Sequence, residues 1–203
     1  MRLRARVRRA CYKMAVIAID PGKCGAIATF VNYTYRVYDI PTMTVITGKG
    51  KRLKKSTEYD LEAIKTLLGN IKTLCLQPVI YAVVERAEAV SYAATAAHGA
   101  YSNSMHANFE KGRGYGIIEA LLFSIDIPII ASPRPTTWKR DLGLSAAAKT
   151  YKDKKEASRL MALDLYPELA DRLSRKKDDG RAEALLLIEW LQLQLERRKI
   201  VLP

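Results

Sequence analysis

Residues 14–31, MAVIAIDPGKCGAIATFV, are the stretch that decides the fold. Two apolar runs rich in β-branched residues, 14–20 and 26–33, lie on either side of the turn sequence PGKCG. Pro-Gly and Gly between two such runs are typical of a turn that joins neighbouring strands, so this stretch predicts an antiparallel hairpin. A third strand is expected at YRVYDIP, residues 35–41.

The rest of the chain predicts helices and strands in alternation. A helix is expected from Ser56 or Thr57 to Cys75, because apolar residues recur there on one face. The clearest strand is PVIYAVVER, residues 78–86. Further elements are expected as a helix over 103–124, a strand over 127–132, a loop over 133–144, and helices over 153–173 and 179–198. This order indicates one α/β domain whose sheet begins with antiparallel strands.

Positive charge is concentrated in two short segments. The chain has 34 Lys and Arg against 21 Asp and Glu, a net charge of +13. Residues 1–13 hold six positive charges and residues 48–57 hold five, and neither segment contains an acid. Such segments are typical of proteins that bind polyanions, although a charged loop that only aids solubility has the same composition. Residues 1–13 form a basic leader whose order the sequence leaves open.

The amino-acid composition limits the kinds of metal site and the cellular compartments that we expect for this protein. Three well-separated cysteines argue against a disulfide scaffold or a zinc ribbon and favour a reducing compartment. Two histidines are too few for a site built from several imidazoles. No apolar run is long enough to span a bilayer, so we expect no membrane partner. We expect an intracellular protein of the cytoplasm or nucleoid, phage-encoded proteins included; the arginine-rich start leaves an organellar location open.

Carboxylates fall where predicted elements end or begin. Asp20 ends the first strand, Glu85 ends the strand over 78–86, and Asp179 and Glu183 lie four residues apart on one helical face. Each has a structural alternative, because Asp20 precedes a turn proline, Glu85 can pair with Arg86, and an acid at position 178 or 179 can cap a helix. Together, however, they indicate an oxygen-only site for Mg²⁺ or Mn²⁺.

The motifs IAIDPG, VVER, WKRDLG and DDGRAEALL, in this order, resemble those of the RuvC-type Holliday junction resolvases of the ribonuclease H-like superfamily. The resemblance implies an α/β fold over residues 14–203, with a mixed five-stranded sheet flanked by helices. It implies that Lys139 is catalytic and that Lys154 and Lys155 contact DNA. It also implies four catalytic, metal-binding acids that hold two Mg²⁺ or Mn²⁺ ions: Asp20, Glu85, Asp179 and Glu183.

Two departures from the family pattern concern the last pair of acids. They are four residues apart where three is common, which makes Asp178 a rival to Asp179, and a Glu stands where the family usually has Asp. The glycines of KGRGYG, residues 111–116, lack the ending of a phosphate-binding loop and are interpreted as sites of close helix packing.

The expected function is paired, symmetric nicking of four-way DNA junctions by a homodimer that uses no small-molecule cofactor. The helix over 103–124 is the expected dimer interface. The charge of the loop over 49–55 predicts DNA contact by five side chains: Lys49, Lys51, Arg52, Lys54 and Lys55. The alternatives are a nuclease of the same fold acting on other branched DNA or on RNA, and a basic nucleic-acid-binding protein without catalytic activity.

Overall fold

A computed structural model describes residues 14–48, 53–88, 105–144, 151–200 and 202. The basic leader over 1–13 lies outside this part of the chain, as do Lys49, Lys51 and Arg52 of the basic loop.

The central sheet has five strands: β1 (Met14–Ile19), β2 (Ala26–Val31), β3 (Thr34–Asp39), β6 (Val79–Val84) and β7 (Ile129–Ala131). Their order in the sheet is β3-β2-β1-β6-β7. The first three strands are antiparallel neighbours, whereas β6 runs parallel to β1 and β7 runs parallel to β6. The mixed five-stranded sheet with three antiparallel strands, which the resemblance implies, is therefore confirmed, as is the hairpin of residues 14–31.

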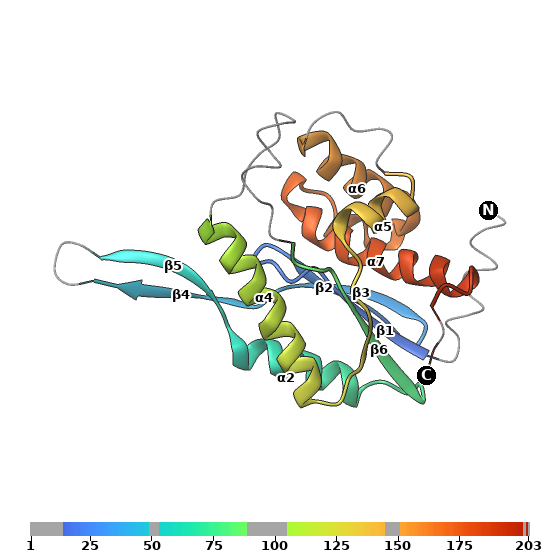
Figure 1. Cartoon of the computed structure of the whole chain (residues 1–203), viewed down its shortest axis with the longest axis horizontal. Helices are drawn as coiled ribbons and strands as arrows, with labels where there is room; N and C mark the ends of the chain where they lie inside the picture. Colours follow the sequence, from blue (N-terminus) through green and yellow to red (C-terminus); the bar gives the residue numbers. More distant parts are fainter. Residues whose placement is uncertain (1–13, 49–52, 89–104, 145–150, 201, 203) are drawn as a thin grey trace.

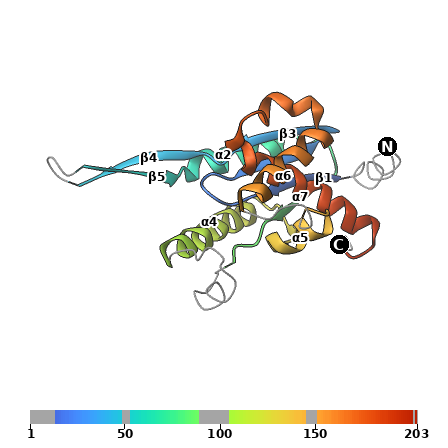
Figure 2. The ribbon, with the colours of Figure 1, turned by 90° about the horizontal axis from the view of Figure 1, so that it is seen from above.

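Both faces of the sheet are covered by helices (Figures 1 and 2). Helices α2 (Leu61–Thr73) and α4 (Met105–Ser124) cover one face; α5 (Pro135–Asp141), α6 (Tyr151–Leu165) and α7 (Asp179–Glu196) cover the other. Alternate residues of β1 enter the two cores, Val16 on the side of α7 and Ile17 on the side of α2 and α4. Burial on both faces explains why β1 is apolar throughout, without alternation.

The sequence-based prediction of a helix beginning at Ser56 or Thr57 is wrong. Residues Thr42–Thr47 form β4 and residues Lys54–Tyr59 form β5, and the two strands pair with each other in a separate antiparallel sheet. This hairpin extends away from the body of the protein as an arm (Figures 1 and 2). Helix α2 begins after the arm, where the Asp60 side chain accepts a hydrogen bond from the backbone N–H of Ala63 at 3.0 Å. The β-branched run over 42–47 supplies a strand partner that outweighs the helical pattern at 56–59.

Two other boundaries differ from the prediction. The segment expected to be a loop contains α5, which begins at Pro135, where proline's fixed φ and missing N–H suit the first helical turn. The helix expected to reach 173 ends at Leu165, because Pro167 follows and the chain continues as the 3-10 helix η2 (Pro167–Arg172). Among the helices of the described residues, none is long and apolar enough to cross a bilayer.

Candidate active site

Asp20 and Glu85 lie side by side because they follow paired parallel strands. The last residues of β1 and β6, Ile19 and Val84, are register partners, and the N–H of Glu85 donates to the carbonyl of Ile19 at 2.8 Å. Parallel strands present their carboxyl ends at the same edge of a sheet, so both acids emerge together. The structure thus brings together the first two acids that the sequence singled out.

Helix α7 adds Glu183 to this pair. Glu183 is buried one turn after Asp179, and its charge acts on both Asp20 and Glu85. A glutamate reaches this position because Gly180 allows α7 to approach the β1–β2 turn: a Cβ there would lie 2.4 Å from the carbonyl oxygen of Cys24. The C-terminal acids are thereby held against the end of β1.

Two lysines neutralise the helix acids. The Lys139 ammonium donates to Glu183 Oε1 at 2.6 Å, and the Ser158 hydroxyl donates to the same oxygen at 3.4 Å. Lys155, on α6, forms an ion pair with Asp179. Burial raises the pKa of Asp20, and the two ammonium groups offset a small part of that rise, which places them near this strand-end acid.

Burial and mutual repulsion make the strand-end acids hard to ionise. Burial, followed by the charges of Asp20 and Glu183, raises the pKa of Glu85 to about 8. Burial and the charge of Glu183 raise the pKa of Asp20 to about 6. Such shifts are typical of functional sites, where like charges gather against their electrostatic cost. The cluster has an excess of negative charge that a cation would relieve.

Asp178 lies in a different network from Asp179. Its carboxylate, buried before the start of α7, accepts hydrogen bonds from Arg175 at 2.7 and 3.1 Å and pairs with Arg181 at 3.5 Å. Although burial opposes the effect, Arg175 holds the pKa of Asp178 below its usual range. Both arginines occupy the side chain of Asp178, so the geometry favours Asp179 as the acid available to the cluster.

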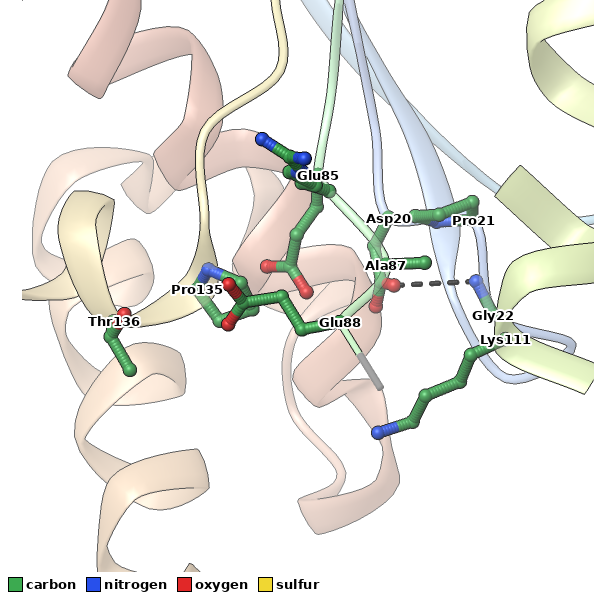
Figure 3. A pocket seen from close by; sticks show the side chains of 10 residues that line it. Asp20, Pro21, Gly22, Glu85, Ala87, Glu88, Lys111, Pro135 and Thr136 are labelled. Atoms are coloured by element: carbon green, nitrogen blue, oxygen red, sulfur yellow. Dashed lines mark hydrogen bonds between the residues drawn. The ribbon is translucent and has the colours of Figure 1, made fainter. Parts of the chain in front are cut away.

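A pocket of about 270 Å³ opens beside the strand-end acids (Figure 3). Lys111 of α4 reaches toward it from one side, and Pro135 and Thr136 of α5 border it on another. Sequence reasoning missed Lys111, which belongs to the KGRGYG segment that was interpreted only for its glycines. Its neighbour Gly112 faces open space, so the glycine pattern carried no signal for Lys111.

Sequence reasoning also missed Trp138, the residue before Lys139. Its buried indole N–H donates to Glu85 Oε2 at 2.7 Å, which fixes one oxygen of that carboxylate. The two residues are 53 positions apart, so only the fold reveals the contact.

The carboxylate side chains of the cluster are of the type that binds a divalent cation, although they are not arranged as a complete set of metal ligands. Within the described ranges, no three His, Cys, Asp or Glu side chains are arranged as a metal-ligand group. Glu183 and Asp179 are instead turned to the ammonium groups of Lys139 and Lys155. The donor set of the cluster is carboxylate oxygen, which suits Mg²⁺ or Mn²⁺.

The expected DNA-binding lysines whose side chains the structure describes, Lys54, Lys55 and Lys155, lie in two separate places. Lys155 borders the cluster, and the side chain of Lys154 is outside what the structure describes. Lys54 and Lys55 are exposed on β5, in the arm rather than in the expected loop. The prediction that the glycines of KGRGYG allow close helix packing holds for Gly114 only, because Gly112 and Gly116 face open space.

The strand order and the flanking helices define a ribonuclease H-like fold. Solved structures with a similar fold include T. thermophilus RuvC in complex with a Holliday junction substrate, at 14% identity, a TM-score of 0.47, and coverage of 91% of this chain and 96% of that chain. Another Thermus thermophilus RuvC structure has 18% identity, a TM-score of 0.43, and coverage of 89% and 96%. No family model and no curated protein matches the sequence. The similarity concerns the fold, and function is inferred from this chain's own residues.

Proposed function

We propose that this protein is a metal-dependent endonuclease that resolves four-way DNA junctions by paired nicks. The observation that carries the proposal is that Asp20 and Glu85 emerge at one sheet edge next to Glu183 of α7, with raised pKa values for the two strand-end carboxyls. Burying several like charges together is electrostatically unfavourable, so the cluster indicates a site that binds a cation. The basic arm indicates a polyanionic substrate. The sequence motifs that carry the RuvC-type resemblance fall on these same residues.

Four carboxylates would hold the metal ions: Asp20, Glu85, Asp179 and Glu183. When bound, a pair of Mg²⁺ or Mn²⁺ ions activates a water and stabilises the leaving oxygen of a phosphodiester. Trp138 holds one oxygen of Glu85 and leaves the other for a further ligand. Lys139 and Lys155 balance the acids before substrate arrives and then offer ammonium groups to a phosphate.

The direct test is an incubation of the protein with labelled four-way junction, linear duplex and RNA:DNA hybrid, each with Mg²⁺ or EDTA. We expect symmetric nicks in two opposite strands of the junction, only with Mg²⁺. Cleavage of the hybrid alone would indicate a ribonuclease. Junction binding without cleavage of any substrate in Mg²⁺ or Mn²⁺ would indicate a DNA-binding protein and contradict the proposal.

We propose that the β4–β5 arm binds DNA. Changing the five cations of residues 49–55, which are Lys49, Lys51, Arg52, Lys54 and Lys55, to Gln is expected to weaken junction binding. It should also flatten the salt dependence, by about 0.9 in the log–log slope for each duplex phosphate that the protein no longer neutralises. Because the acids are untouched, cleavage at saturating protein should survive. Fluorescence anisotropy over a salt series measures the slope.

A matched pair of double variants distinguishes the effect of the arm lysines from the effect of lowering the net charge of the protein. Lys54→Gln with Lys55→Gln removes two exposed arm charges, and Lys65→Gln with Lys199→Gln removes two exposed charges elsewhere. Only the first pair should flatten the slope. Equal slopes for the two pairs would show that these arm lysines do not touch DNA.

We also propose a homodimer formed through α4, because paired nicks need two sites. Met105, Phe109 and Phe123 recur at helical spacing on one side of α4 and are 90%, 67% and 84% exposed. Gly112 and Gly116 lie on the same stripe, with no described atom within 4 Å of an added Cβ. A second copy of this stripe would cover the apolar side chains, and isologous contact would match the two-fold symmetry of the junction.

Phe109→Glu is therefore expected to convert a dimer into a monomer at micromolar protein, because it places charge in the interface core. Light scattering measures the mass. Leu76→Glu serves as the control, since Leu76 is 86% exposed and lies outside α4. A wild-type monomer, with and without DNA, would contradict the dimer; an unchanged mass in the Phe109 variant would move the interface elsewhere.

A further inference from the structure

The turn that follows Asp20 is held by a tyrosine from the base of the arm. Tyr59, the last residue of β5, is buried, and its hydroxyl donates to the carbonyl of Pro21 at 3.0 Å. The N–H of Gly22 donates in turn to Asp20 Oδ1 at 3.3 Å. The carbonyl of Pro21 and the N–H of Gly22 belong to one planar peptide group. Tyr59 and the Asp20 carboxylate therefore bind opposite ends of the same peptide.

Close packing by α4 keeps this arrangement in place. A Cβ on Gly114 would lie 2.2 Å from the Tyr59 hydroxyl oxygen and 2.5 Å from the Pro21 carbonyl oxygen. Only glycine fits there, so α4 presses directly on the hydrogen bond. Within the turn itself, a Cβ on Gly25 would lie 2.1 Å from the carbonyl oxygen of Asp20. The turn is thus closely packed both against α4 and within itself.

Ion pairs join the same turn to the arm and to α4. Lys23, in the turn, pairs with Glu58 of β5 at 3.4 Å and with Glu110 of α4 at 2.6 Å. Arg113 of α4 pairs with Glu58 at 2.6 Å. The two cations also lie over the ring of Tyr59, at 5.6 and 5.9 Å from its centroid. The base of the arm is consequently bound to the segment that carries Asp20.

We propose that Tyr59 is a positioning residue for Asp20, acting through the Pro21–Gly22 peptide. The proposal rests on the proposed nuclease function, in which Asp20 must present its carboxylate in one orientation. Loss of the hydroxyl frees the peptide to rotate, which loosens the Gly22 N–H that holds Oδ1. The residue touches neither substrate nor metal, and its effect reaches the reaction only through Asp20.

The test compares Tyr59→Phe with Tyr115→Phe. The control removes a similar hydrogen bond, between Tyr115 of α4 and Ser132 at 3.1 Å, in which neither partner belongs to the turn. We expect Tyr59→Phe to lower kcat for junction cleavage by about tenfold with little change in KM, because misorientation of a catalytic group acts on the chemical step. Tyr115→Phe should leave both constants close to those of wild type.

Amide hydrogen exchange gives a readout that does not depend on activity. The Gly22 amide should exchange about fivefold faster in Tyr59→Phe, the effect expected from removing one hydrogen bond, and at the wild-type rate in Tyr115→Phe.

Gly114→Ala should produce the same two changes, a lower kcat and faster exchange of the Gly22 amide, whereas Gly69→Ala, with no described atom within 4 Å of its added Cβ, should not. Unchanged kcat and exchange in the Tyr59 and Gly114 variants would overturn the positioning role and leave the nuclease function intact. An inactive wild-type protein would instead contradict the function, and exchange would still test the hydrogen bond.

Discussion

Asp20→Asn and Glu85→Gln are each expected to lower junction cleavage by at least about 10³-fold, because each removes a negatively charged ligand worth several kcal/mol in the transition state. Junction binding should persist or tighten in both variants. Under the proposed function, binding depends mainly on the basic segments, and removal of an acid reduces the repulsion of phosphate. Cleavage in Mg²⁺ and anisotropy with EDTA measure the two quantities on the same protein preparations.

The acids at the start of α7 provide an internal control for this prediction. Asp179→Asn should reduce cleavage more than Asp178→Asn, since Asp179 pairs with Lys155, whose ammonium also acts on Asp20. Asp178→Asn should lower stability instead, because it leaves Arg175 and Arg181 without their buried carboxylate. The opposite ranking would assign the ligand to Asp178. Mg²⁺-dependent nicking retained by both the Asp20 and Glu85 variants would refute the site.

The strand ends could be predicted because their signals are local. Asp20 and Glu85 each follow an apolar, β-rich run, and the parallel pairing of β1 with β6 brings the two ends together. Asp179 and Glu183 share a helix face through spacing alone. Sheet geometry is thus enough to bring Asp20 and Glu85 together, and helical spacing is enough to put Asp179 and Glu183 on one face. The docking of α7 against the β1–β2 turn at Gly180 is not encoded by either pattern.

The arm could not be predicted in the same way. Residues 54–59 carry lysines, a glutamate and a tyrosine, a pattern that helices also accept, and they become a strand only because 42–47 pairs with them. The hydrogen bonds of Trp138 with Glu85 and of Tyr59 with Pro21 span 53 and 38 residues. Such bonds depend on how α5 and the arm pack, which no local pattern encodes.

The raised pKa values have a consequence for stability without metal. Glu85 has an ordinary pKa of 4.5 when the chain is unfolded and about 8 in the folded protein. Between these values the folded state keeps a proton that the unfolded state releases, so the free energy of unfolding falls as pH rises. Each unit of pKa difference corresponds to about 1.4 kcal/mol, and the decrease is complete once the pH exceeds the folded value.

Glu85→Gln should therefore stabilise the metal-free protein by a few kcal/mol at pH 8.5, because the amide bears no charge to bury, and by little at pH 5, where the folded wild type is already protonated. Urea unfolding in EDTA at both pH values measures the difference. A smaller slope between pH 4 and 6 should remain in the variant, since Asp20 keeps its own raised pKa. Glu168→Gln, at an exposed position in η2, is the control and should shift stability equally at both pH values. If Glu85→Gln destabilises the protein at pH 8.5, the carboxylate is held by attractive contacts and the repulsive cluster is not present.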